Sequence, residues 1–194
     1  MVDLGCGSGA LLEALEDQFE ARIGLDVSTR RLEQSESGRA HSWQFRQADL
    51  NGAFPLESSS VDAVIANQVI EHIVNPISFC NEIHRVLKPG GRCVVTTPNI
   101  RYLRNIARIL VAGHGPRTAC GETLDGAWDD GHIHYFTHRD LREIMAQIGF
   151  RVVRSRALVD IGDNGAVRRV LDSRSDSWLI REFLSGNILV WAEK

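Results

Sequence analysis

Short apolar runs alternate with amphipathic segments through the first hundred residues of the chain. The apolar runs are typical of buried strands in a parallel sheet, and the clearest is 61–67, where apolar side chains are nearly continuous. The amphipathic segments repeat their apolar residues at helical spacing, as in 10–19. The pattern predicts strands at 2–4, 22–27, 42–47, 61–67 and 92–97, and helices at 8–19, 29–37 and from 76 to the stop signal at 88–91. Asn75 is the predicted cap of the last of these helices, with Pro76 at its first position. This alternation indicates an α/β fold with a doubly wound, mostly parallel sheet.

The pattern is less regular after residue 98. A helix is predicted at 99–111, and the segment from Thr137 to Asp140 has the spacing of a capping box, which predicts a helix that ends at Gly149. Further strands are expected at 150–154 and 187–192, with a short helix at 177–184. We interpret the chain as a single domain over 1–194, with 98–136 as an insertion on the substrate side.

A glycine-rich turn joins the first strand to the first helix. Such a turn leaves free backbone N–H groups at the positive end of the helix dipole, and glycine lets a ligand approach that backbone closely. Gly5, Gly7 and Gly9 therefore indicate a cradle for a nucleotide-type ligand. Gly5, Gly7 and Ala10 also satisfy the loose dinucleotide pattern G-x-G-x-x-A, so the loop alone does not identify the ligand.

Three acids narrow the choice of ligand. Asp3 precedes the glycine loop, Asp26 ends the second predicted strand and Asp49 follows the third. Ligands of open α/β sheets bind at the carboxyl ends of the strands, so these acids should share one edge. Acids without a basic residue in the loop suit a ligand with hydroxyls, an amine and a cation, and a polyphosphate-binding Gly-Lys-Ser/Thr motif is absent.

Composition limits the other classes of function. The formal net charge is −3, which argues against nucleic-acid binding by bulk electrostatics. The sequence has neither a signal peptide nor a long apolar run, and its cysteines lack the spacing of a zinc knuckle, so we expect a cytoplasmic protein with reduced thiols. Because the glycine loop begins at residue 5, we also expect that an N-terminal segment covering the site is absent.

In combination, several segments resemble the successive motifs of class I S-adenosylmethionine-dependent methyltransferases. These segments are 2–9, 25–28, 48–50, 61–72 and 87–91. The resemblance implies a seven-stranded sheet whose last strand is inserted antiparallel. It also implies S-adenosylmethionine as the cofactor and S-adenosylhomocysteine as the product.

The resemblance assigns the methionine end of the cofactor to Asp3 and to four loop residues, Gly5, Cys6, Gly7 and Gly9. Asn67, at the end of the fourth predicted strand, would offer its carbonyl to the amine of the ligand.

The resemblance places the nucleoside end of the cofactor at the second and third strands. Asp26 would bind the ribose hydroxyls, with Val27 against the adenine. Asp49 would accept a hydrogen bond from the adenine amino group, with the backbone of Leu50 beside it.

The pair Glu71-His72 resembles methyltransferases of the ubiquinone and small-molecule O-methylation type. It therefore favours an enzyme that methylates a small molecule at oxygen. His72 would act as general base for an oxygen acceptor, and the alternative is that it caps or packs its loop. Glu71 either orients that loop or contacts the substrate.

His132 and His134 form a His-x-His pair inside the insertion. If this pair converged with Glu71 and His72, a divalent metal could bind there, but no ligand set is complete in the sequence, so no metal is predicted. His134 is a further catalytic candidate, and the alternative is that it fixes the insertion by a hydrogen bond.

Two alternative functions remain. Residues 97–99 and 133–141 resemble MetW-type proteins of methionine biosynthesis, which leaves a non-catalytic partner protein as a second hypothesis, although Glu71-His72 favours an enzyme. An NAD(P)-dependent oxidoreductase is disfavoured by Gly9 and Asp49.

The expected partner is a small-molecule acceptor, with no nucleic acid. Arg101, Arg104 and Arg108 form a stripe that suits anionic lipid headgroups, but a solvated helix face is the commoner role of such a stripe, so a membrane is not expected as a partner.

Overall fold

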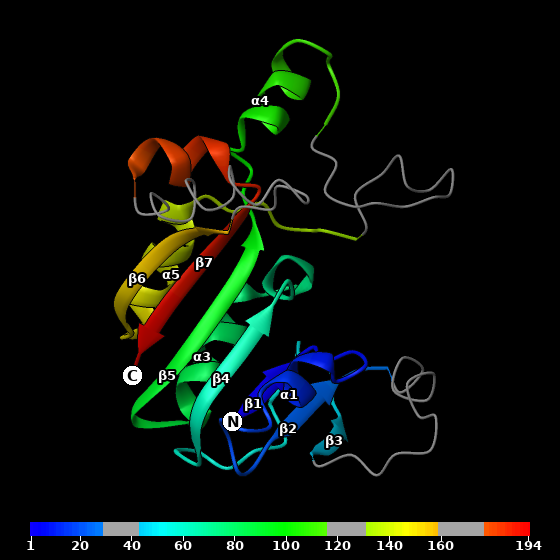
Figure 1. Cartoon of the computed structure of the whole chain (residues 1–194), viewed down its shortest axis with the longest axis vertical. Coiled ribbons are helices and arrows are strands. Elements are labelled where there is room, and N and C mark those ends of the chain that lie inside the picture. Colours follow the sequence, from blue (N-terminus) through cyan, green and yellow to red (C-terminus); the bar gives the residue numbers. More distant parts are fainter. Residues whose placement is uncertain (29–42, 116–130, 159–176) are drawn as a thin grey trace.

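A seven-stranded sheet with helices on both faces forms the body of the protein (Figure 1). The computed structural model describes residues 1–28, 43–115, 131–158 and 177–194. The helix predicted at 29–37 and residues 116–130 of the predicted insertion, which include Cys120, lie outside the described residues.

The strand order confirms the predicted fold class. The sheet runs β3-β2-β1-β4-β5-β7-β6. The first five strands are parallel, and β7 lies antiparallel between β5 and β6, as the family resemblance implies. The strands span Val2–Leu4 (β1), Ile23–Asp26 (β2), Gln44–Gln47 (β3), Val61–Asn67 (β4), Leu87–Pro98 (β5), Arg151–Leu158 (β6) and Asn187–Glu193 (β7).

The longer helices begin at the predicted caps. The side chain of Asn75 accepts a hydrogen bond from the backbone of Ser78, and Thr137 forms the predicted capping box with Asp140. Both arrangements satisfy N–H groups that have no partner within the helix. The helical segments are α1 (Ala10–Ala14), η1 (Ile70–His72), α3 (Pro76–Val86), α4 (Leu103–Leu110), α5 (His138–Ile148) and η3 (Ile180–Leu184).

Several element boundaries differ from the prediction: α4 begins at Leu103 rather than at residue 99, β6 extends to Leu158 rather than to residue 154, and two further differences have a visible cause. The first helix ends at Ala14 because the Arg22 guanidinium donates to the carbonyl of Leu12, and the amide of Glu16 bonds to Glu13 instead. Strand β5 begins at Leu87 rather than at residue 92, with an irregular register against β4. In both places a tertiary hydrogen bond or strand pairing overrides the local signal.

Strand β4 is apolar at nearly every position because both of its faces are covered by other elements. Val64 and Ala66 belong to a hydrophobic core that includes residues of α3 and α5. Ala63 and Ile65 pack against a second apolar cluster that contains Leu12 of α1. Since successive side chains of a strand point to opposite faces, a strand covered on both faces is apolar at almost every position.

Candidate functional site

The glycine loop lies at the carboxyl end of β1, where backbone constraints require glycine. Gly5 and Gly9 have φ values of +71° and +81°. A Cβ on Gly9 would lie 2.0 Å from Cζ2 of Trp43, and one on Gly5 would lie 2.6 Å from Cγ2 of Val69. A side chain at either position is therefore excluded by both conformation and space. Trp43 is a neighbour of the loop that the sequence pattern did not reveal.

The acids at the ends of β1 and β2 lie next to this loop. Oδ2 of Asp26 accepts a hydrogen bond of 2.9 Å from the backbone N–H of Gly7, and Oδ1 accepts one of 2.9 Å from that of Ser28. A carboxylate oxygen has two lone pairs, so each oxygen retains one for a ligand hydroxyl. Burial of Asp3, together with the negative charge of Asp26, raises the pKa of the Asp3 carboxyl to about 7.

The side chain of Cys6 faces the interior rather than the ligand edge. It is buried, and a Cβ on Gly24 would lie 2.6 Å from its sulfur. Burial, with the nearby charges of Asp3 and Asp26, raises the pKa of the thiol to about 12. Cys6 therefore stays protonated and contributes its backbone to the loop. Cys80 and Cys93 are also free and buried, as expected for reduced thiols.

Asp49 is exposed and lies two residues after the end of β3. Its Oδ1 accepts hydrogen bonds of 2.9 Å from both the backbone and the side-chain amide of Asn51, which lower its pKa. The side chain of Val27 is 64% exposed, whereas that of Leu50 is buried in the core. This burial is compatible with the backbone role implied for Leu50.

A hydrogen-bonded turn fixes the end of β4. The side-chain oxygen of Asn67 accepts a bond of 2.7 Å from the hydroxyl of Thr96. The same hydroxyl accepts from the backbone and the side chain of Gln68, whose φ of +57° is unusual for a residue other than glycine. The exposed side chain of Asn67 is thus held at the edge where the acids gather.

Three chemically active side chains meet just beyond β4. Glu71 and His72 lie in η1, and His132 comes from the segment that follows the undescribed part of the insertion. One carboxylate oxygen and one nitrogen of each histidine all lie within 4.8 Å of one another. Oε1 of Glu71 is 4.0 Å from Nε2 of His132, and the two imidazole rings pack edge to face with centroids 4.6 Å apart.

Segment 131–136 holds His132 in this position. The backbone N–H groups of Ile133 and His134 donate to the backbone carbonyl of Glu71, at 2.9 and 3.2 Å. At the far end of the segment, the amide of Ile100 donates to the carbonyl of Phe136. Segment 131–136 therefore bridges η1 and the end of β5.

His134 lies beside the cluster without joining it. Its Nε2 is 3.2 Å from the carbonyl oxygen of Val74, and the amide of Val74 donates to the side-chain oxygen of Asn51 at 2.8 Å. A continuous set of hydrogen bonds thus connects Asp49, Asn51, Val74 and His134. This geometry matches the alternative in which His134 fixes the insertion.

The glycine loop follows β1, Asp26 ends β2, Asp49 follows β3 and Glu71-His72 follows β4, so these residues lie at the carboxyl ends of neighbouring parallel strands. The sequence offered His132 and His134 together as residues that could converge with Glu71 and His72, and no sequence signal shows that His132 is the one that approaches Glu71. Asn51 was also missed, although its position two residues after Asp49 is the spacing of an Asx turn.

The predicted arginine stripe divides in the structure. Arg101 forms an ion pair of 2.9 Å with Glu182, and its guanidinium lies over the ring of Phe183. Arg104 is exposed and Arg108 is half-buried on α4, which extends beyond the carboxyl end of β5 (Figure 1). Among the described residues, no helix combines the length and the apolar character needed to cross a membrane.

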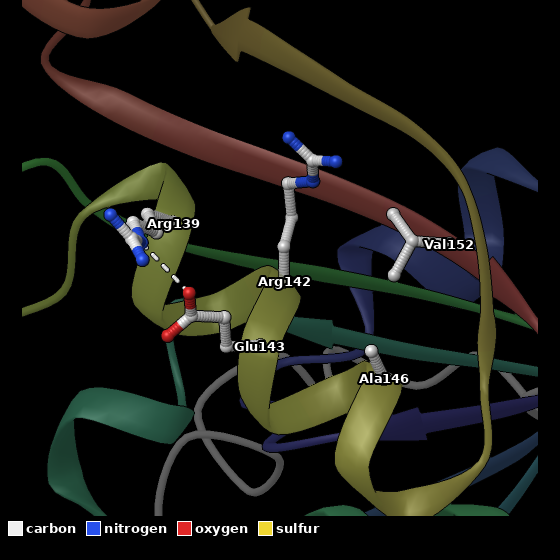
Figure 2. Close-up of a pocket in the computed structure, with 5 residues that line it drawn as sticks. All are labelled: Arg139, Arg142, Glu143, Ala146 and Val152. Atoms are coloured by element: carbon white, nitrogen blue, oxygen red, sulfur yellow. Dashed lines mark hydrogen bonds and ion pairs between the residues drawn. The ribbon is translucent and has the colours of Figure 1, made fainter.

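A surface pocket lies at the edge of the sheet formed by β6, away from the glycine loop (Figure 2). It is formed by α5 and the edge strand β6, and β4, β5 and β7 separate β6 from β1. Arg139 and Glu143 form an ion pair of 2.7 Å at its rim. The pocket is lined by Arg139, Arg142, Glu143, Ala146 and Val152, and it takes no part in the glycine-loop site.

Comparison with known proteins gives a consistent result. A family model described as a methyltransferase domain matches residues 2–95. A mitochondrial ubiquinone biosynthesis O-methyltransferase of Dictyostelium discoideum is 28% identical over 58% of this chain, which covers 39% of that protein. A probable S-adenosylmethionine-dependent methyltransferase of Mycolicibacterium smegmatis is 35% identical over 51% of this chain and 38% of its own length. The chain thus spans about two fifths of these relatives.

The fold has solved counterparts. A crystal structure of an S-adenosylmethionine-dependent methyltransferase from Mesorhizobium loti superimposes with a TM-score of 0.70 at 20% identity. The match covers all of this chain and 89% of that one, so the likeness extends beyond the residues that the family model matches.

Proposed function

We propose, from the premise that the chain belongs to the class I S-adenosylmethionine-dependent methyltransferases, that it transfers a methyl group from S-adenosylmethionine to an oxygen atom of a small molecule. The observation that supports this proposal best is the pairing of Asp3 and Asp26 beside the glycine loop. This arrangement concentrates negative charge at the place where a cationic ligand would bind.

The residues present fit the cofactor. When bound, S-adenosylmethionine supplies an electrophilic methyl group on a positively charged sulfur. Burial and the charge of Asp26 raise the pKa of the Asp3 carboxyl to about 7, and a positive charge beside it would make this carboxyl ionise more readily. Asp26 keeps lone pairs for hydroxyl groups of the ligand, and the exposed Asp49 retains acceptor capacity for an amino group.

The acceptor side of the proposal is supported by the residues beyond β4. Nδ1 of His72 is 3.2 Å from the carbonyl oxygen of Gly131. A carbonyl only accepts hydrogen bonds, so Nδ1 carries the proton and Nε2 is the basic nitrogen. Nε2 would accept the proton of an acceptor hydroxyl. Oxygen as the acceptor atom is also supported by the name of the Dictyostelium discoideum relative.

Calorimetric titration with S-adenosylmethionine tests the cofactor assignment. Asp26→Ala should weaken binding at least tenfold, because two backbone N–H groups lose their partner and ribose hydroxyls lose an acceptor. Asp17→Ala is the matched control, since Asp17 is an exposed acid outside the site. Equal affinity of wild type and Asp26→Ala would overturn the assignment.

A screen of small molecules, read out by S-adenosylhomocysteine release, tests the reaction. On an identified substrate, His72→Ala should lower kcat while cofactor affinity stays unchanged, and His114→Ala, which alters another exposed histidine, should leave both unchanged. Full turnover of His72→Ala would exclude His72 as the base. Cofactor binding without turnover on any acceptor would favour the non-catalytic partner protein.

A further inference from the structure

We propose that Glu71, His72 and His132 form a binding site for a divalent first-row transition metal ion. Two imidazoles and one carboxylate converge from two segments that are distant in sequence. Convergence of this kind is the condition that the sequence alone could not establish. The proposal concerns metal binding by the chain itself and does not depend on methyl transfer.

The distances suit a site that contracts slightly around an ion. Metal–ligand bonds of about 2.0–2.2 Å place neighbouring ligand atoms about 3 Å apart and opposite ones about 4 Å apart. The Glu71 oxygen and the His132 nitrogen are 4.0 Å apart, and all three ligand atoms lie within 4.8 Å of one another. Small side-chain rotations that move each ligand atom by about an ångström would bring the three atoms to bonding distance from one ion.

Hydrogen bonds outside the cluster orient its members as metal ligands require. A histidine that binds a metal usually donates its other ring N–H to a carbonyl or carboxylate. His72 does so through Nδ1, which faces the carbonyl of Gly131 at 3.2 Å, and this leaves Nε2 to bind the ion. Gly131 directly precedes His132, so the same contact joins the two histidine ligands.

The backbone adds a second constraint. The backbone carbonyl of Glu71 accepts hydrogen bonds from the amides of Ile133 and His134, and these bonds fix segment 131–136 relative to η1. Glu71 and His132 therefore approach each other through main-chain hydrogen bonds, and their approach does not rely on flexible side chains alone.

Burial and charge favour a cation at this place. The Glu71 side chain is fully buried and the His132 side chain is 8% exposed, whereas His72 is exposed. A divalent ion beside the buried Glu71 carboxyl would stabilise its ionised form, and it carries more positive charge than one imidazolium. The exposed side at His72 leaves coordination positions open, as in metal sites that bind water or substrate.

The donor set indicates the class of metal. Imidazole nitrogen suits zinc, iron, cobalt, nickel and copper, while magnesium and calcium prefer sites made only of oxygen. If the proposed function is correct, an open position would bind the acceptor oxygen and favour its deprotonated form. The lone pair of Nε2 cannot bind the ion and accept a proton at the same time, so a filled metal site would replace the general-base role given to His72 above, and metal removal should then reduce turnover.

Titration of the whole chain with Co²⁺ after chelator treatment tests the proposal, with absorption spectra and calorimetry as readouts. We expect one ion per chain and visible absorption bands of Co²⁺ bound to nitrogen. His132→Ala and His72→Ala should each weaken binding at least tenfold, and His114→Ala should bind like wild type because that histidine lies outside the cluster.

Equal Co²⁺ affinity of wild type, His132→Ala and His72→Ala would overturn the proposal, as would binding in wild type no tighter than about 1 mM. His72 is exposed, so its replacement should preserve the fold, and circular dichroism checks this. Titration with S-adenosylmethionine separates the two proposals. Cofactor binding without Co²⁺ binding contradicts only the metal site, and Co²⁺ binding without cofactor binding contradicts only the proposed function.

Discussion

Replacing Asp3 with asparagine should make the protein more stable at alkaline pH while it weakens cofactor binding. The carboxyl of Asp3 has a pKa of about 7 in the folded chain, because it is buried and lies near Asp26, against an ordinary value of 3.8. At pH values between these two pKa values, the folded state binds more protons than the unfolded state. The contribution of Asp3 to the free energy of unfolding of the wild type therefore falls as pH rises from about 4 to about 7.

The size of this effect follows from the same pKa difference. Each tenfold change in proton affinity is worth about 1.4 kcal/mol, so the whole window corresponds to about 4 kcal/mol and the part above pH 5 to about 3 kcal/mol. Asparagine has a similar shape and no proton to lose. Relative to wild type, Asp3→Asn should thus gain about 3 kcal/mol in free energy of unfolding between pH 5 and pH 8.

Urea unfolding at pH 5 and pH 8, followed by tryptophan fluorescence, measures this difference. Asp17→Asn controls for the loss of an exposed acid. If the free energies of wild type and Asp3→Asn changed in parallel with pH, the burial argument for Asp3 would be refuted. The same reasoning predicts that wild-type cofactor affinity rises between pH 6 and pH 8, with proton release on binding below pH 7. Calorimetry in two buffers of different ionisation enthalpy detects that release.

Three further predictions concern other parts of the fold. Gly9→Ala should lower thermal stability by about 2 kcal/mol or more and change tryptophan fluorescence, because its Cβ would overlap Trp43 and its φ is +81°; an unchanged melting curve would contradict the close contact. Burial lowers the pKa of His138 to about 4, so the contribution of His138 to the free energy of unfolding should fall by about 2 kcal/mol from pH 7 to pH 5, and His138→Gln should lack this pH-dependent loss. Glu82→Gln should cost about 1 kcal/mol at pH 7, because Glu82 accepts two hydrogen bonds from Arg85, and this cost should vanish in acid as the lowered pKa of Glu82 is passed; urea titrations at several pH values measure both.

Local signals were sufficient to predict most of the fold. The apolar run at 61–67 coincides with β4, and the caps at Asn75 and Thr137 begin the helices that they predict. The acids at strand ends also depend on local order, because parallel strands bring their carboxyl ends to one edge. These features need only neighbouring residues to be recognised.

Features that depend on contacts between residues distant in the sequence could not be predicted from it. The first helix is short because Arg22 takes a carbonyl of Leu12, and nothing in the helical pattern reports that competition. His132 approaches Glu71 because the amides of the two residues after it, Ile133 and His134, donate to the backbone carbonyl of Glu71 from a segment far away in the sequence. The raised pKa of Asp3 likewise depends on how deeply the assembled sheet buries the residue. Such properties arise only when the chain is folded.

The hydrogen bonds that connect Asp49, Asn51, Val74 and His134 have a consequence for how this chain can evolve. The first three residues lie within the part matched by the methyltransferase model, and His134 lies outside it. Residues in one hydrogen-bond network typically show interaction energies of about 0.5–3 kcal/mol. The effect of a substitution at Asn51 therefore depends on which residue occupies position 134. The part of the chain that the family model matches and the part that follows it are therefore coupled through this network, and a second half taken from another protein would need residues that restore the bond at position 134.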